Sequence, residues 1–167
     1  MTHTIVLQLD HLIRLDLSSV TTIVEPLLIE ATQPKASSNE IVSYEQTLSF
    51  EIYYPRSSTD LRELSEIPEV RLWFIRLDSV YPWIPFFLDW KGGELARYFA
   101  MLVPHQFSRT EGIQYNPEAL EIFIMHKLFT LSDWLKLRRI PSIDRLQSMA
   151  RMFGYDLDKD FLYSLLC

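Results

Sequence analysis

The sequence contains very little cysteine: among its 167 residues only Cys167, the last, carries a thiol. A single thiol cannot form a disulfide within these residues. It also cannot supply the several thiolates that usually bind a structural zinc ion or an iron–sulfur cluster. The sequence therefore predicts no cofactor and no metal centre held by this chain alone.

Long apolar runs and an excess of positive charge are also missing. Charges or prolines interrupt the apolar stretches well before the roughly 20 residues that a membrane span needs. The first residues lack the basic segment and apolar run of a secretory signal. Sixteen basic against 22 acidic residues leave a formal charge of −6, which opposes binding to nucleic-acid phosphates or anionic membranes. We expect a cytoplasmic protein with no nucleic-acid partner and no stable membrane insertion.

The composition that remains is globular, with 48% hydrophobic and 23% charged residues. A chain of this length predicts a single domain, 1–167, with one sizeable core. Alternating apolar and polar residues predict strands near 4–10 and 48–54 and allow a third near 86–90. The segment 32–46 shows no sustained period, so we expect a flexible loop or insertion there.

Helical periodicity covers much of the rest. Pro68 suits the first position of a helix that continues to about Tyr81, and Asn116-Pro117-Glu118 combines a capping side chain, a proline and an acid at a helix start. That second helix should reach about Leu137, and Gly154 is placed to close a further one. We expect an α+β fold in which a small, mostly antiparallel sheet packs against about five helices, with a helical C-terminal half.

The loop around His105 is the strongest candidate for a catalytic site, because it also carries Arg109 and Glu111. No nucleophile elbow, opposed pair of acids or phosphate-binding loop accompanies it. A structural role for His105 is therefore favoured. The alternative is a small hydrolase or metal-dependent enzyme centred on this loop. In that case the polar residues of the loop would lie beside aromatic residues that line the site.

The aromatic stretch from Val70 to Trp90 is the most unusual feature. Apolar residues of its helix face the expected core, whereas Leu72 and Ile75 project to the other side, which predicts either deep burial or a second contact surface. Tryptophan, tyrosine and arginine are enriched among the residues that dominate protein interfaces. The candidate protein-binding residues, here and in the His105 loop, are Arg71, Arg76, Trp83, Trp90, Lys91, His105, Arg109, Glu111 and Tyr115.

Several longer strings point to a known family. They are R-E-L-S-E-I-P-E-V-R-L-W-F at 62–74, Y-P-W at 81–83, L-D-W-K at 88–91, L-V-P-H-Q-F at 102–107 and E-G-I-Q-Y-N-P-E-A-L at 111–120. From about Leu61 to the C-terminus this pattern resembles the chlororespiratory reduction 6 family of cyanobacteria and chloroplasts.

The resemblance implies a function that the residue patterns alone do not predict. It implies an assembly factor, not an enzyme, for the photosynthetic NADH dehydrogenase-like complex. The implied partner is the iron–sulfur subunit NdhI, bound before it joins the hydrophilic arm of the complex. The implied location is the cytoplasm, or the chloroplast stroma in plant relatives. The resemblance carries no catalytic residues with it.

Overall fold

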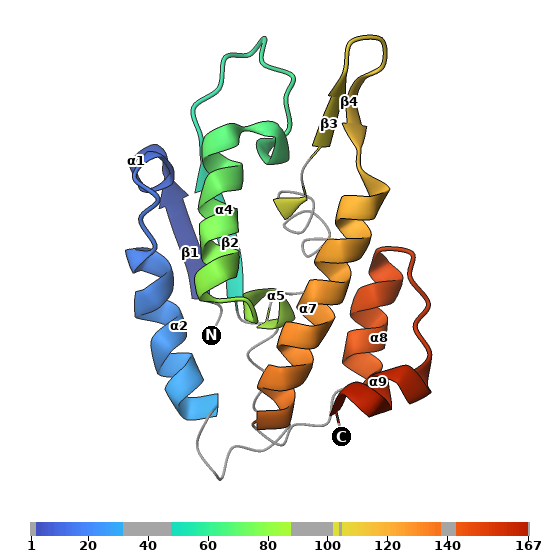
Figure 1. Ribbon diagram of the computed structural model, residues 1–167. Helices are drawn as coiled ribbons and strands as arrows, with labels where there is room; N and C mark the ends of the chain where they lie inside the picture. The colour runs from blue at the N-terminus through green and yellow to red at the C-terminus, as the bar shows by residue number, and fades with distance from the viewer. Residues whose placement is uncertain (1–2, 32–47, 88–101, 104, 138–142, 167) are drawn as a thin grey trace. The chain divides into compact units, whose positions relative to one another are not determined.

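The computed structural model describes residues 3–31, 48–87, 102–103, 105–137 and 143–166 (Figure 1). The internal contacts of the chain divide it into two compact units, residues 1–102 and 103–167. The single domain expected over 1–167 stays a prediction. The segment 32–46, expected to be a flexible loop, lies outside the described residues.

The first unit contains a two-stranded parallel sheet. Strand β1 (His3–Gln8) pairs with β2 (Leu48–Tyr53), in a register that runs from His3 opposite Leu48 to Gln8 opposite Tyr53. Both strands were predicted, although the last two residues of the predicted strand 4–10 belong to the helix α1 (Leu9–Ile13). The expectation of a mostly antiparallel sheet is wrong for this pair. Alternation of apolar residues assigns a strand's faces and not its direction. Direction depends on the connection, and a helix between the strands permits the parallel crossover.

Five helical segments accompany this sheet: α1 (Leu9–Ile13), α2 (Ser18–Ala31), the 3₁₀ helix η1 (Leu64–Glu66), α4 (Pro68–Val80) and α5 (Ile84–Phe87). The strand allowed at 86–90 is wrong for its first two residues, which belong to α5; the other three are not described. Pro85 is compatible with the first turn of a helix, where its missing N–H is not needed. Short helices such as α1 and α5 explain why the described residues contain seven α-helices instead of about five.

The core of this unit forms where α4 packs against the sheet. Val70, Trp73, Phe74 and Leu77 are buried on one face of α4, as predicted. The ring of Phe50 on β2 lies edge-on to the rings of Trp73 and Phe74, with centroids 6.1 and 5.5 Å away. Such edge-to-face pairs add to the stabilisation from buried area.

The second unit combines a hairpin with helices. Strands β3 (His105–Ser108) and β4 (Gly112–Tyr115) pair antiparallel, and α7 (Pro117–Leu137), α8 (Ile143–Met152) and α9 (Lys159–Leu166) follow. The helical character expected for the C-terminal half is confirmed. The long helix α7 buries Leu120, Ile124, Leu128, Leu131 and Leu135.

The ends of two helices in this unit follow their sequence signals. The Oδ1 atom of Asn116 accepts hydrogen bonds from the backbone N–H groups of Glu118 and Ala119, at 3.1 and 3.2 Å, and so caps α7. Gly154 follows α8 with φ +86°. Its N–H donates to the carbonyl of Arg151, and that of Tyr155 to the carbonyl of Ala150, both at 3.0 Å. This pair of bonds is the Schellman arrangement that terminates a helix at a left-handed glycine.

Replacing Asn116 with alanine is expected to lower the free energy of unfolding by about 1 kcal/mol, because two N–H groups at the start of α7 lose their acceptor. Urea denaturation followed by circular dichroism measures this change. Asn116→Asp is the matched control, since it keeps the acceptor and adds a negative charge at the positive end of the helix dipole. Equal stability of all three proteins would contradict the assigned cap.

Candidate protein-binding site

The outward side of α4 carries exposed apolar side chains. Leu72, Ile75 and Val80 are 53%, 44% and 48% exposed, and Arg76 and Ser79 are exposed between them. At about 100° per residue these five positions share one side of the helix, and we name them the α4 outer face. Three large exposed apolar residues gathered on one helix differ from the scattered single residues that every protein surface shows.

The position of this face follows from how α4 is built. Pro68 occupies its first turn and Glu69 adds a negative charge near the positive end of the helix dipole. The opposite side of the helix is held in the core by Trp73 and its neighbours, so rotation of the helix is restricted. The exposure of Leu72 and Ile75 excludes the deep burial that was one of the two predicted alternatives, and the second contact surface stays a prediction.

The two arginines predicted on this helix differ in environment. Arg76 is exposed within the α4 outer face, and its backbone carbonyl accepts a hydrogen bond from the hydroxyl of Ser79 at 2.8 Å. Arg71 is half-buried, and burial lowers the pKa of its guanidinium from the ordinary value. The outer face therefore combines apolar area with a cationic group that water reaches freely.

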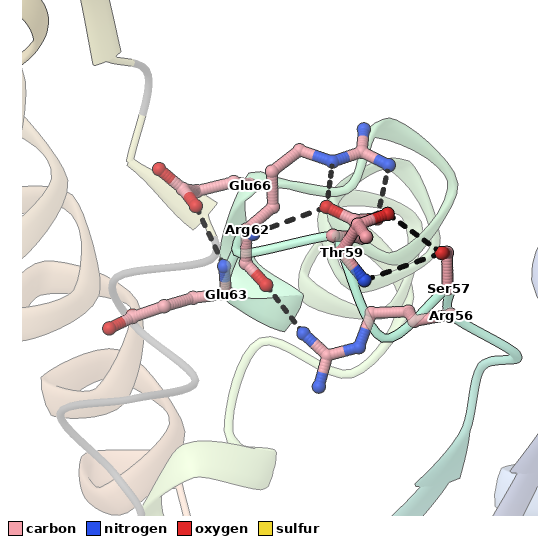
Figure 2. A network of polar contacts seen from close by, with 7 residues as sticks. Arg56, Ser57, Thr59, Arg62, Glu63 and Glu66 are labelled. Atoms are coloured by element: carbon pink, nitrogen blue, oxygen red, sulfur yellow. Dashed lines mark hydrogen bonds and ion pairs between the residues drawn. The ribbon is translucent and has the colours of Figure 1, made fainter.

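A polar network orders the loop that leads into α4 (Figure 2). The carboxylate of Asp60 accepts two hydrogen bonds from the guanidinium of Arg62, at 2.9 and 2.7 Å, and one from the Arg62 backbone N–H at 3.2 Å. This arginine holds the pKa of Asp60 well below its ordinary value, at about 2. Further along the loop, Glu66 accepts a hydrogen bond from the backbone N–H of Glu63 at 2.7 Å. These contacts hold the chain in place immediately before Pro68.

The aromatic residues at the other end of α4 are mostly held inside the unit. The Tyr81 hydroxyl forms a hydrogen bond of 2.7 Å with the hydroxyl of Thr21 on α2. The ring of Trp83 is half-buried and lies edge-on to that of Tyr81 at 6.0 Å. Next to them is a mainly apolar pocket, lined by Phe50, Phe74, Leu77, Asp78, Tyr81, Ile84, Pro85 and Leu102. The predicted contacts Trp90 and Lys91 lie outside the described residues.

The remaining predicted residues belong to the hairpin of the second unit. His105 and Tyr115 are opposite each other in the β3–β4 register, although only their backbone is described. Arg109 and Glu111 are exposed in the turn between the strands. Within the described ranges no group of three histidine, cysteine, aspartate or glutamate side chains could hold a metal ion.

The sequence analysis did not predict a buried lysine on α7. Lys127 is fully buried, and its Nζ lies 5.7 Å from the centroid of the Phe123 ring. Burial lowers the pKa of Lys127 from 10.5 to about 7. The signal that could have found it is helical spacing, because Lys127 falls between Ile124 and Leu131 on the apolar stripe of the helix.

Comparison with known proteins identifies the family. The family model described as chlororespiratory reduction 6 matches residues 7–164. This match also includes the N-terminal third, which the resemblance from sequence strings did not reach. No solved structure matches the chain. Among the described helices, none is both long enough and apolar enough to cross a membrane. The chain belongs to the chlororespiratory reduction 6 family, which is involved in assembly of the NDH complex in photosynthetic organisms.

Proposed function

We propose that this protein is a non-enzymatic assembly factor that binds the iron–sulfur subunit NdhI in the cytoplasm during biogenesis of the NADH dehydrogenase-like complex. The observation that carries the proposal is the family match over residues 7–164. The scarcity of cysteine agrees with a protein that holds a cluster-containing subunit and does not itself supply clusters.

The α4 outer face is the contact that the geometry favours. A subunit that has not yet joined its complex exposes apolar surface that the finished complex will bury, and such surface is prone to aggregate. A holding protein must cover it with apolar area of its own. Leu72, Ile75 and Val80 supply that area, and Arg76 supplies a charge for an acidic group of the partner. Trp83, Arg109 and Glu111 remain further candidates.

Changing both Leu72 and Ile75 to aspartate is expected to weaken capture of NdhI by at least tenfold. Two charges would then have to be desolvated in the interface, while both positions are exposed in the free protein and should tolerate aspartate. The measurement is a titration of purified chain against purified NdhI. The matched control changes Ile122 and Leu137, two exposed apolar residues of α7, to aspartate.

The possible outcomes test the proposed function and the proposed binding surface separately. Undiminished capture by the Leu72→Asp/Ile75→Asp variant would move the contact away from α4 and leave the function standing. The function itself is wrong if the unmodified chain captures no NdhI and deletion of its gene leaves the complex at normal abundance.

A further inference from the structure

Leu61 is the most exposed large apolar side chain in the described part of the chain, with 93% of its surface accessible to water. It lies in the loop between β2 and η1, inside the continuously described segment 48–87. Single exposed leucines are common on protein surfaces and usually need no explanation. Leu61 differs because hydrogen bonds fix the backbone on both sides of it.

The turn that precedes Leu61 is closed by hydrogen bonds. The backbone N–H of Asp60 donates to the carbonyl of Ser57 at 3.0 Å. The hydroxyl of Ser57 also forms a 2.8 Å hydrogen bond with the hydroxyl of Thr59 and accepts one from the Thr59 backbone N–H at 3.3 Å. Serine and threonine side chains stabilise turns in this way. The chain therefore reaches Leu61 in a defined conformation.

The two neighbours of Leu61 are bonded to each other (Figure 2). The carboxylate of Asp60 accepts hydrogen bonds from the backbone N–H and the guanidinium of Arg62, and the guanidinium of Arg56 donates to the carbonyl of Arg62. A bidentate arginine–carboxylate pair within a network is the case in which an exposed ion pair holds its geometry. These bonds span Leu61 and leave its side chain in solvent.

A fixed backbone lowers the cost of burying this side chain in a complex. Association loses free energy when loops become ordered at an interface. At residues 56–62 this order is already present in the free protein. Removing the isobutyl group of Leu61 from water then contributes as it does for a core leucine. An exposed leucine on an ordered loop thus has the properties of an anchor that enters a pocket of another protein.

The surroundings of Leu61 indicate the character of that pocket. The pocket must be apolar to take up a leucine. Arg56 is exposed and its guanidinium donates to a carbonyl, which is a neutral group, so its positive charge favours an acidic side chain at the rim. The pocket beside Phe50 in a second copy of this chain is too small, because its free space of about 20 Å³ holds a single water-sized group.

We propose that Leu61 inserts into an apolar pocket of the partner subunit, where an acidic side chain of that subunit lies next to Arg56. Leu61 is the anchor of this contact, and Asp60 and Arg62 are positioning residues that act through it. The contact uses residues other than those of the α4 outer face. This inference rests on the proposed binding of NdhI.

The first experiment truncates the anchor. Leu61→Ala is expected to weaken capture of NdhI at least tenfold, because it removes most of the apolar surface that the complex buries. The measurement is a titration of purified full chain against purified NdhI. Ile13→Ala is the matched control, since Ile13 is a 61% exposed aliphatic residue of α1 in the same unit. It should change capture by less than about twofold, and thermal unfolding should be the same for both variants.

The second experiment tests whether the clamp acts through the anchor. Arg62→Gln removes the bonds to the Asp60 carboxylate and is expected to weaken capture about threefold to tenfold, because the loop must then be ordered on binding. In a protein that already carries Leu61→Ala, the same change should cost less than about twofold. A purely structural role of Arg62 would give equal losses in both proteins. Arg56→Gln should make capture less dependent on salt concentration.

The outcomes can be told apart with a photoreactive leucine analogue in place of Leu61. A crosslink to NdhI, together with loss of capture by Leu61→Ala, supports the proposal. If NdhI binds but gives no crosslink, or Leu61→Ala binds as tightly as the unmodified chain, Leu61 is not an anchor, although the proposed function survives. Crosslinks only between copies of this chain would assign Leu61 to self-association and overturn the inference. Absence of any NdhI binding would overturn the function and this inference together.

Discussion

Replacing Lys127 with methionine is expected to raise the free energy of unfolding by about 3–5 kcal/mol below pH 7, because one pKa unit corresponds to about 1.4 kcal/mol. Burial lowers the pKa of Lys127 from 10.5 to about 7, so in the folded protein its charged form is disfavoured. Methionine fills a similar volume without a charge. The measurement is urea denaturation of both proteins at a series of pH values.

The dependence on pH has a defined direction. Below pH 7 Lys127 is protonated in the folded and unfolded chain, and the full cost of burying the charge is present. Between pH 7 and about 10.5 the unfolded chain holds a proton that the folded chain has released, so the stability of the unmodified protein rises with pH. The advantage of Lys127→Met is therefore largest at low pH and shrinks toward pH 10.

A matched control tests whether burial is the cause. Lys136 lies on the same helix and is exposed, so Lys136→Met should change stability by no more than about 0.5 kcal/mol at any pH. If Lys127→Met were instead less stable than the unmodified protein below pH 7, the lysine would be a net stabilising element and the expected burial cost would be wrong.

Truncating Trp73 to alanine is the second change with a large expected effect, a loss of about 3–5 kcal/mol in the free energy of unfolding. The side chain is fully buried, touches the rings of Phe50 and Phe74, and donates from Nε1 to the backbone carbonyl of Asp16 at 2.8 Å. Alanine would leave a cavity between α4 and the sheet and also remove this donor.

Trp73→Phe separates the two contributions. It keeps most of the ring but leaves the Asp16 carbonyl without the indole donor, which costs about 1–3 kcal/mol. Denaturation monitored by circular dichroism measures both variants, and Trp83→Phe, at a half-buried ring, is the comparison that should lose less. A Trp73→Ala protein as stable as the unmodified chain would show that this tryptophan does not belong to the core.

The contacts inside the first unit limit which aromatic residues could bind the partner. Trp73 is a core residue whose ring nitrogen is satisfied inside the unit, and Tyr81 is tied to Thr21. Among the residues of the stretch that the structure describes, the exposed side chains include the aliphatic Leu72 and Ile75 and the cationic Arg76. A variant that removes these exposed side chains should therefore change binding without the loss of stability expected for Trp73→Ala.

Local features of the fold were predictable from sequence because short-range interactions determine them. The alternation at 48–54, the cap at Asn116 and the left-handed position of Gly154 depend on neighbouring residues, and each appears in the structure. The family could also be identified from strings such as the one at 62–74, and the match over 7–164 confirms it.

Other features depend on segments far apart in the sequence, and only the tertiary structure decides them. The parallel pairing of β1 with β2 joins residues 45 positions apart, and nothing within either strand specifies its direction. Whether Leu72 and Ile75 meet solvent or a neighbouring element depends on what packs against α4, and so does the burial of Lys127 on α7. The sequence by itself determined local features such as the start of α7 and the end of α8, and the family to which the chain belongs, whereas packing between distant segments decided the direction of the strands and which side chains are buried.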